Sequence, residues 1–468
     1  MIDAALGVYN ALSSNGKPLG DLEFTVLASI GLRIDAGVAN TAADLNIVIS
    51  LATGTRSAGL SVIDAPGRLV KDSHAEVLAK RAFNIFIIET LAQLDRQPEF
   101  EDDILCIFNK QSVCSSLPQY CIKPGYSFHL FISDSPCGDS CIYKLSTGTL
   151  AFTGAKLICS ESPEVLEKIF DVHNETLPTI GGMRCVRESG EQSLSCLRLK
   201  PGRSDIADRS ASMSCSDKVA RWLVLGLQGK ILSSIVGRIP LSSVSVGLDP
   251  LASSAEEQLA ALHRSLVDRL PCLHDSQRIP SLHVIDMDNR FPHGKQAVAM
   301  KYQQGQQQEG ALERDGQPAK KRRKKDVFPC STSLNCLLDL SVYFQCMNRQ
   351  KLLCEGLPRK CYNNNVEILV GNEGLLQGCT LMSSQEKYSR LSRLSMRHWL
   401  ADRIGAVDEA KQTLTLDTNN YQVWKHHQLT KLESHPLNSR YREYLKNEAA
   451  FFQHASFKDW VHSSTNPI

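Results

Sequence analysis

The spacing of apolar residues predicts alternating strands and helices in the first third of the chain. Leu45–Leu51 is rich in β-branched residues and is expected to form a strand. Ser73–Leu94 carries apolar residues near helical spacing and predicts a long helix. Two further apolar runs, Ile104–Phe108 and Tyr126–Ile132, are expected to be strands, and a short helix is expected just after Pro136. This alternation indicates an α/β fold.

The pattern is less regular in the rest of the chain. Residues 160–205 hold many glycines, serines and charges, so we expect loops there. Ser216–Val236 predicts a helix, and Ser242–Gly247 predicts a strand. Three helices are expected near the C-terminus, at Glu386–Ile404, Tyr421–Leu432 and Ser439–Phe452. The α/β core is therefore expected to be elaborated by a mostly helical C-terminal part.

Residues 300–326 differ from their surroundings. They are low in complexity and almost free of apolar side chains, and Lys320–Lys325 is a run of six basic residues, KKRRKK. Such a segment is expected to be disordered. Patterned sequence resumes at Leu337, so we interpret the segment as an insertion within a single domain spanning residues 1–468. The basic run is either a nuclear localisation or RNA-binding segment, or a solvated linker without a role.

Composition and charge place the chain among ordinary globular proteins. It has 468 residues, 42% of them hydrophobic, and a net charge of +2. We see no apolar run of about 18 residues and no signal peptide, so no membrane contact is expected. We therefore expect an intracellular protein, nuclear or cytoplasmic, whose 16 cysteines are mostly reduced. With so small a net charge, any contact with nucleic acid must come from local clusters.

Two short motifs carry chemistry. His74-Ala75-Glu76 lies at the start of the long predicted helix, and Ser135–Asp139, SPCGD, follows a predicted strand. Together they form the two halves of the zinc deaminase signature, H-x-E followed by P-C. Such a centre holds zinc through one histidine and two cysteines and leaves a fourth position for water, while the glutamate carries protons. Each half is common by chance, but the pair in this order is far more specific.

The second cysteine of this signature is not where it is usually found. The familiar spacing is P-C-x-x-C, whereas the next cysteine after Cys137 is Cys141, one residue later. Two alternatives therefore stay open: the third zinc ligand is either Cys141 or a residue from elsewhere in the chain. His129 is expected to be a core histidine. Buried or surface thiols without metal-like spacing are expected at Cys159, Cys185, Cys196, Cys330, Cys336 and Cys346.

Longer blocks resemble a known family. Ser212–Trp222, SMSCSDKVARW, resembles the M-S-C-S-D-K-x-A-R-W block of the adenosine deaminases that act on RNA. Thr53–Arg56 resembles the T-G-T-K segment of that family. Asp72–Val77 and Ser135–Asp139 resemble two other blocks. The four blocks occur in the family's order, which makes the resemblance specific.

The resemblance implies both a fold and a set of roles. The fold would be an α/β structure with a cytidine-deaminase-like mixed sheet as its core and helices that bear the zinc site. His74, Cys137 and Cys215 would bind zinc, and Glu76 would move protons while adenosine becomes inosine. Thr55 lies where the family places a residue near the target nucleotide.

Within the family, the sequence favours a tRNA substrate. Leu197–Asp205, LRLKPGRSD, and Thr153–Lys156, TGAK, resemble the branch that modifies the adenosine on the 3′ side of the anticodon. The first block begins near residue 45, so no double-stranded-RNA-binding domain is expected before it. Four alternatives remain. The protein could edit double-stranded RNA, deaminate a free nucleoside, bind RNA as a catalytically inactive relative, or use the zinc site only for structure. The oligomeric state is open.

Basic residues near Cys215 are candidates for contact with tRNA. Arg187, Arg198, Lys200 and Arg203 are expected to form a patch against the RNA backbone, with Lys200 and Arg203 as direct contacts. The family's base-flipping loop has no clear match, although residues 188–191 lie in roughly that region.

The family also encloses inositol hexakisphosphate. The resemblance implies that the polyphosphate is bound by Lys80, Arg81, Lys218, Arg221, Trp222, Gln228, Arg393, Tyr421, Lys425, Tyr441 and Trp460. Burying so many cations without a polyanion would cost several kcal/mol per unpaired charge. Asp72 and Lys218 are expected to connect this site to the zinc site. The alternative is that Lys80, Arg81 and Arg393 are solvated charges on helix faces.

Overall fold

The computed structural model describes most of residues 1–457. The residues outside it are 60–61, 63–66, 112–118, 152–155, 160–178, 181–182, 187–193, 201–209, 211, 234, 271–278, 288–289, 303–326, 347–356, 358–359, 364, 384–386, 397, 399–438, 455 and 458–468. The helix expected at Tyr421–Leu432 and the basic run Lys320–Lys325 therefore lie outside the described residues and stay predictions.

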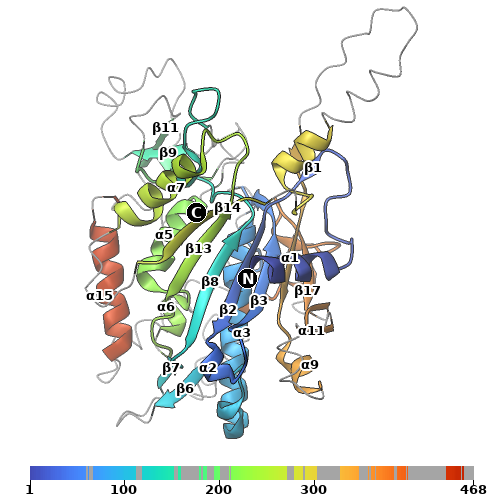
Figure 1. The fold of residues 1–468 in the computed structure, drawn as a ribbon, viewed down its shortest axis with the longest axis vertical. Coiled ribbons are helices and arrows are strands. Elements are labelled where there is room, and N and C mark those ends of the chain that lie inside the picture. The colour runs from blue at the N-terminus through green and yellow to red at the C-terminus, as the bar shows by residue number, and fades with distance from the viewer. Residues whose placement is uncertain are drawn as a thin grey trace, which may run out of the picture.

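An eight-stranded mixed sheet forms the centre of the fold (Figure 1). In spatial order its strands are β14 (Ser281–Ile285), β13 (Leu241–Gly247), β8 (Tyr126–Ile132), β2 (Leu27–Ile34), β3 (Leu45–Thr53), β16 (Thr332–Leu337), β17 (Val366–Val370) and β18 (Leu375–Leu376). The β14–β13–β8 pairings are parallel, and the others are antiparallel. The mixed α/β sheet expected from the sequence is confirmed.

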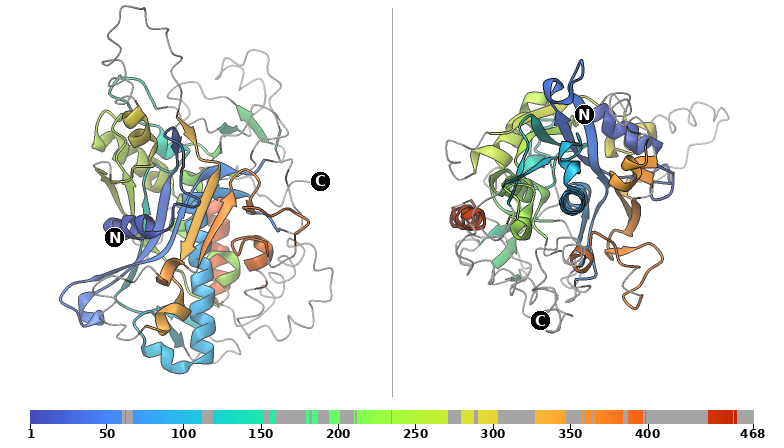
Figure 2. Two further views of the ribbon diagram at one scale, coloured as in Figure 1. Left: turned by 90° about the vertical axis from the view of Figure 1, so that its right-hand side faces the viewer. Right: turned by 90° about the horizontal axis from the view of Figure 1, so that it is seen from below.

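Strands on both sides of the 303–326 segment belong to this sheet. β14 precedes the segment, whereas β16 and β17 follow it and pair beside the N-terminal strand β3. Figure 2 shows β16 and β17, in orange, beside the blue N-terminal strands. This arrangement supports the interpretation of residues 300–326 as an insertion within one domain, which stays a prediction.

Helices cover the two faces of the sheet. α3 (Ala75–Arg96) packs on one face, where Ser50 of β3 donates a hydrogen bond to the Ala79 carbonyl. α1 (Ile2–Ala11) begins on the other face, where Gly31 lies so close to Met1 that a Cβ would come 1.9 Å from its sulfur.

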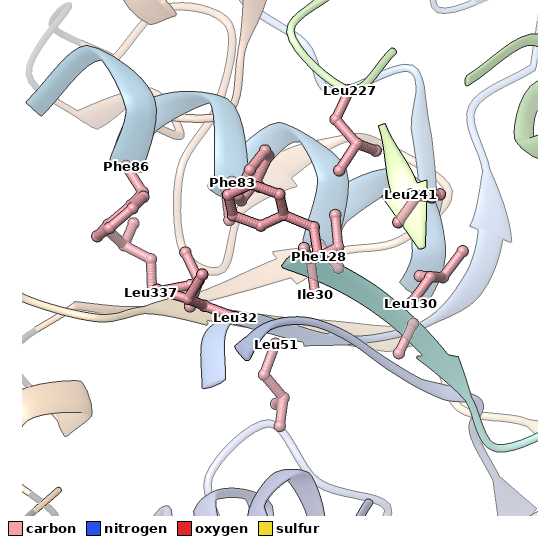
Figure 3. Close-up of a cluster of buried hydrophobic side chains, with 14 of the residues drawn as sticks. Ile30, Leu32, Leu51, Phe83, Phe86, Phe128, Leu130, Leu227, Leu241 and Leu337 are labelled. Atoms are coloured by element: carbon pink, nitrogen blue, oxygen red, sulfur yellow. The ribbon is translucent and has the colours of Figure 1, made fainter. Parts of the chain in front are cut away.

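The apolar core lies between α3 and the sheet. Figure 3 shows Phe83 and Phe86 of α3 above Ile30 and Phe128, whereas Leu51 points to the opposite side of the sheet. All five side chains are buried. The core therefore holds the middle of α3 against the central strands.

The remaining elements are all shorter than α3. The helices are α2 (Ala36–Ala39), α5 (Cys215–Leu225), α6 (Gly229–Leu232), α7 (Ala255–His263), α9 (Leu340–Phe344), α11 (Lys360–Asn363) and α15 (Ser439–Gln453), with 3-10 turns η2 (Pro98–Asp102) and η3 (Asp139–Cys141) and a π-helical turn η5 (Arg264–Asp268). Small sheets pair β1 (Glu23–Phe24) with β15 (Phe328–Pro329), β4 (Thr55–Ser57) with β5 (Asp72–His74), and β6 (Phe108–Gln111) with β7 (Gln119–Ile122). None of the described helices has the length and hydropathy needed to span a membrane.

Several expected elements differ from those observed. The strand expected at Ile104–Phe108 is wrong, because β6 begins only at Phe108. The helix expected after Pro136 is a three-residue 3-10 turn. The helix expected at Ser216–Val236 ends at Leu225, since Gly226 has a φ of +86°, and the short α6 follows it. The helix expected at Glu386–Ile404 is α-helical, among its described residues, only at 393–396 and 398. The others, at β3, β8, β13, α3 and α15, are confirmed within a few residues.

The region expected to be loops contains a small antiparallel sheet. Its order is β10 (Thr179–Ile180), β11 (Met183–Val186), β9 (Lys156–Cys159) and β12 (Arg198–Leu199). β12 pairs with β9, which places the residues before Cys215 beside a segment about forty positions earlier in the chain. This non-local pairing places β12 near the candidate site.

Candidate active site

His74 and Glu76 are positioned by the junction between β5 and α3. His74 ends β5, opposite Thr55 of β4, and is also the N-cap residue of α3, so Glu76 falls in the first helical turn. Gly54 approaches this junction closely: its φ is +146°, and a Cβ there would lie 2.0 Å from the Ser73 carbonyl oxygen. Only glycine fits such a position without strain.

The two cysteines come from a loop after β8 and from the start of α5. Cys215 is the first residue of α5, and its backbone N–H points at the sulfur of Cys137, 3.4 Å away. Gly138 has a φ of +109°, and a Cβ would lie 2.3 Å from the hydroxyl oxygen of Ser214. The loop can approach α5 because residue 138 is a glycine. A helix N-terminus also favours a thiolate.

These elements bring together the three expected ligands. His74 Nδ1 lies 3.8 Å from the sulfur of Cys137 and 3.6 Å from that of Cys215, and all the ligand atoms lie within 4.8 Å of one another. One imidazole and two thiolates are donors that zinc prefers, and three protein ligands are typical of a catalytic zinc site. The donor set therefore fits zinc.

Cys141 is not part of this group. Its thiol donates hydrogen bonds to the carbonyl oxygens of Ser135 and Pro136, at 3.2 and 3.1 Å. Burial raises the pKa of this thiol well above its ordinary value, which keeps it a neutral donor. Of the two alternatives left by the sequence, the structure groups the distant Cys215, rather than Cys141, with His74 and Cys137.

A buried carboxylate and two lysines surround the cluster. Lys200 donates to Asp72 at 2.8 Å and to the sulfur of Cys215 at 2.9 Å, while Lys218 pairs with the other carboxylate oxygen of Asp72. Burial opposes the ionisation of Asp72, but Lys200 and Lys218 more than offset this and hold its pKa well below the ordinary value. The hydrogen bond from Cys215, with help from Lys200 and His74, lowers the pKa of Cys137. The site therefore favours a thiolate even before a metal binds.

Two polar side chains beside His74 have atoms available to a substrate. Glu76 is 3% exposed, and one of its carboxylate oxygens, Oε2, has no hydrogen-bond partner among the described residues. The hydroxyl of Thr55, across the β4–β5 pairing, likewise has no partner within the described part of the chain. Buried polar groups normally have partners, so these atoms point to a ligand or water.

The expected patch of basic residues against tRNA requires a correction. Lys200 and Arg198 have no exposed side-chain surface, because both point into the protein and pair with Asp72 and Asp139. The prediction that Lys200 contacts the tRNA backbone is therefore wrong, since a side chain without exposed surface cannot reach a phosphate. Arg187 and Arg203, with residues 188–191, lie outside the described residues and stay predictions.

Cations gather where the resemblance places the polyphosphate. Burial, with Arg81 and Arg221 nearby, lowers the pKa of Lys80 to about 7. Arg221 and Lys230 both pair with Glu448 of α15, each at 2.8 Å. Figure 1 shows α15 beside α5 and α6. Desolvation and two neighbouring arginines both oppose the charge of Lys80, and a bound polyanion would offset both, so these residues fit a polyanion.

The structure gives less direct support for the other residues expected to bind the polyphosphate. Gln228 is buried, and its amide bonds to the backbone of Leu225 and Ile239. Lys218 faces Asp72, which is the expected connection to the metal cluster. Trp222 is 9% exposed, and Arg393 is half-buried. The side chains of Tyr421, Lys425, Tyr441 and Trp460 lie outside the described residues.

Sequence reasoning missed the carboxylates behind the two cysteines. Asp139 and Asp217 each follow a cysteine ligand by two residues and are fully buried. Asp139 pairs with Arg198 and Arg264, and Asp217 pairs with Arg269. Their identical offset from Cys137 and Cys215 was the available signal. His129, in contrast, bonds to two serines away from the cluster, as expected for a core histidine.

The fold and the site together define a class of protein. A mixed α/β sheet that brings one histidine, two cysteines and a nearby glutamate to a helix start has the architecture and donor set of the zinc nucleobase deaminases. Comparison of the sequence is more specific: the adenosine-deaminase (editase) domain model matches residues 50–464. The chain belongs to this family.

Named relatives fall into two groups. The tRNA-specific adenosine deaminase 1 of Drosophila melanogaster is 30% identical over 275 residues, 58% of each chain. The human protein of that name is 25% identical over 382 residues, which are 62% of this chain and 73% of the relative. The double-stranded RNA-specific adenosine deaminase of Mus musculus is 30% identical over 243 residues, which are 51% of this chain and 18% of the relative. The chain thus spans less than two thirds of the length of the Drosophila and mouse proteins.

Proposed function

We propose that this protein is a zinc-dependent enzyme that hydrolyses adenosine to inosine in tRNA, at the adenosine on the 3′ side of the anticodon. The observation that carries the proposal is the His74, Cys137 and Cys215 cluster, with an unpartnered oxygen of Glu76 beside it among the described residues. A structural zinc site would be expected to close with four protein ligands, whereas this group supplies three.

The chain's residues divide the work of the reaction. His74, Cys137 and Cys215 would hold zinc, which when bound would offer an open position for water and would lower the pKa of that water toward neutrality. Glu76 accepts a proton from the attacking water and passes it to the purine ring. It then takes the proton of the hydroxyl newly formed on C6 and passes it to the amine, as the C6–N6 bond breaks and ammonia leaves. The Thr55 hydroxyl, across from His74, would bind the target nucleotide.

Lys200 and Asp72 keep the cluster in its reactive state. Lys200 sets a positive charge beside the sulfur of Cys215, which stabilises the thiolate that a metal requires. Asp72 accepts the backbone N–H of His74 at 3.1 Å and thereby orients the ligand at the helix start. Neither residue needs to touch the substrate.

The relatives named for tRNA and the cost of extruding the target base both support a tRNA substrate over the alternatives. The Drosophila and human relatives named for tRNA cover more of this chain than the mouse relative named for double-stranded RNA. A base in a single-stranded anticodon loop also costs less to extrude than one in a duplex. Double-stranded RNA is the second candidate, because the mouse relative matches at the same identity as the Drosophila protein.

The substrate class is tested by offering the zinc-loaded protein equal concentrations of unfractionated tRNA, a long RNA duplex and free adenosine. We expect inosine in the tRNA alone, next to the anticodon, measured by nucleoside mass spectrometry and by sequencing. Inosine in the duplex alone would show that double-stranded RNA, the second candidate, is the substrate. Inosine from free adenosine alone would show that the RNA is irrelevant to recognition.

We also propose that the cation cluster around Lys80 holds inositol hexakisphosphate. Lys80, Arg81, Arg221 and Lys230 are the described cations that would bind it, because lysine and arginine form strong charge-assisted hydrogen bonds with phosphate. The protein would then contain about one polyphosphate per chain, released only on denaturation. Mass spectrometry of acid-denatured pure protein that finds no inositol phosphate would contradict this.

A further inference from the structure

Arg198 joins the two segments that carry the cysteine ligands. Its guanidinium donates to Asp139 at 2.9 Å, and Asp139 lies two residues after Cys137. Its backbone bonds to the first turn of α5: the N–H donates to Asp217 at 3.0 Å, and the carbonyl accepts from Ser214 at 2.7 Å. Ser214 and Asp217 flank Cys215, so one residue bridges the loop of Cys137 and the helix of Cys215.

The bridge is buried. The side chains of Arg198 and Asp139 are both 0% exposed. A buried charge pair is costly to form and therefore weak evidence for stability, but removal of one partner leaves an uncompensated charge and disturbs its surroundings strongly. We propose that Arg198 is a positioning residue that fixes the separation of Cys137 and Cys215 and thereby sets the affinity for the metal. This inference rests on the metal centre of the proposed function.

The physical reason lies in how thiolate ligands are held. A metal site whose ligands are already in place loses less conformational freedom when the ion binds, and residues behind the ligands supply this order. Cys137 lies in a loop that ends in the three-residue turn η3, without a long helix to hold it. The N–H of Ser216 in α5 holds the Cys137 carbonyl at 3.0 Å, and the Arg198–Asp139 pair adds a second hold two residues further along the loop. The backbone bonds of Arg198 would survive a change of its side chain.

Two neighbouring arginines offer matched controls. Arg264 also bonds to Asp139, at 3.1 Å, but its hydrogen bonds to the carbonyl oxygens of Asp139 and Ile142 go to the same loop rather than to α5. Arg269 pairs with Asp217 at 2.7 Å, on the α5 side. Each therefore contacts one of the two segments, whereas Arg198 contacts both.

The test compares Arg198→Lys with Arg264→Lys and the wild type. Lysine keeps the charge but lacks the planar fork that fits the carboxylate and the neighbouring carbonyl. Zinc affinity is measured by competition with a chelating dye. The absorption spectrum of the cobalt-substituted protein reports the geometry of the cysteine ligands. We expect Arg198→Lys to lower zinc affinity by about 10- to 100-fold and to shift the cobalt bands, and Arg264→Lys to stay close to the wild type in both.

A second variant keeps the test decisive if Arg198→Lys folds poorly. Asp139→Asn retains the size of the acceptor and weakens its pairs with Arg198 and Arg264, so it is expected to lower zinc affinity at least as much as Arg198→Lys. The double variant should lose less than the sum of the two single losses, because both changes break the Arg198–Asp139 pair. Wild-type affinity and an unshifted cobalt spectrum in Asp139→Asn, or additive losses in the double variant, would overturn the inference. A wild-type protein that binds neither zinc nor cobalt would instead overturn the proposed metal centre.

Discussion

Burial decides what the charged side chains around the metal cluster do. Arg198 and Lys200 alternate with Leu199, so they lie on the same side of the chain at β12, and sequence spacing alone predicts a solvated basic face. Their partners Asp139 and Asp72 lie 59 and 128 residues away, so no local pattern shows that this face points inward. The ligands could be predicted because each belongs to a short contiguous motif. The partners of the basic residues could not, because long-range packing brings them there.

At the residue scale, Lys200→Met is expected to lower the free energy of unfolding by about 3 kcal/mol. It removes one of two ammonium partners from the buried Asp72 and leaves the sulfur of Cys215 without its neighbouring ammonium group. Urea denaturation measures the loss. Lys144→Met, at an exposed lysine, is the control and is expected to change stability by less than about 0.5 kcal/mol.

The same variant separates the structural role of Lys200 from contact with RNA. The dependence of tRNA affinity on salt concentration should be unchanged in Lys200→Met, because a buried lysine releases no counter-ions from the phosphate backbone. A variant with wild-type stability and a shallower salt dependence would restore the rejected contact between Lys200 and tRNA.

At the scale of elements, the sequence predicts those whose pattern is local. The long helix α3 and the strands β3, β8 and β13 follow from periodicity and β-branched content. The β9–β12 sheet could not be predicted, because its strands are two to four residues long and are stabilised by pairing with one another. The end of the helix after α5 could likewise not be predicted, since a single glycine inside an apolar run is compatible with a continuing helix.

The contact between the Cys137 loop and α5 depends on the glycine at position 138. Gly138→Ala is expected to cost about 1–3 kcal/mol in backbone strain and to force the loop away from Ser214, so zinc affinity should fall as well. Gly148→Ala is the control: its φ of +83° carries similar strain, but a Cβ there meets nothing within 4 Å. Zinc titration and thermal unfolding of both variants measure the difference. Equal zinc affinity in the two would show that the close approach is irrelevant to the metal.

At the scale of the whole molecule, the cation cluster connects three parts of the chain. Lys80 belongs to α3, Arg221 to α5 and Lys230 to α6, and Glu448 of α15 pairs with the last two. The cations can be found in the sequence, but their closeness in space cannot, because it requires α3, α5 and α15 to pack together. A bound polyanion would therefore stabilise the packing of these helices as well as the charges themselves.

The pH dependence of stability tests whether a polyanion is bound. Without one, the pKa of Lys80 is about 7 in the folded protein, against 10.5 for an ordinary lysine. Between these values the unfolded chain holds a proton that the folded chain lacks, so the free energy of unfolding should rise with pH from about 7 to about 10. A bound polyphosphate keeps Lys80 protonated and removes this rise.

Thermal unfolding of wild type and Lys80→Met, with and without added inositol hexakisphosphate, measures the effect. The polyphosphate-free wild type should gain stability relative to Lys80→Met as pH increases above 7, and the added polyphosphate should abolish the difference in slope. Identical slopes for both proteins in every condition would mean that Lys80 is a solvated charge on a helix face.

The most direct test of the central claim compares the wild type with Glu76→Gln on unfractionated tRNA, with the zinc content of both proteins measured. Glutamine keeps the shape of the side chain but cannot carry the proton. We predict inosine next to the anticodon with the wild type, equal zinc in both proteins, and a rate lower by about 10²- to 10⁴-fold in Glu76→Gln. A folded, zinc-loaded wild type that forms no inosine in tRNA, or a Glu76→Gln variant as fast as the wild type, would contradict the account.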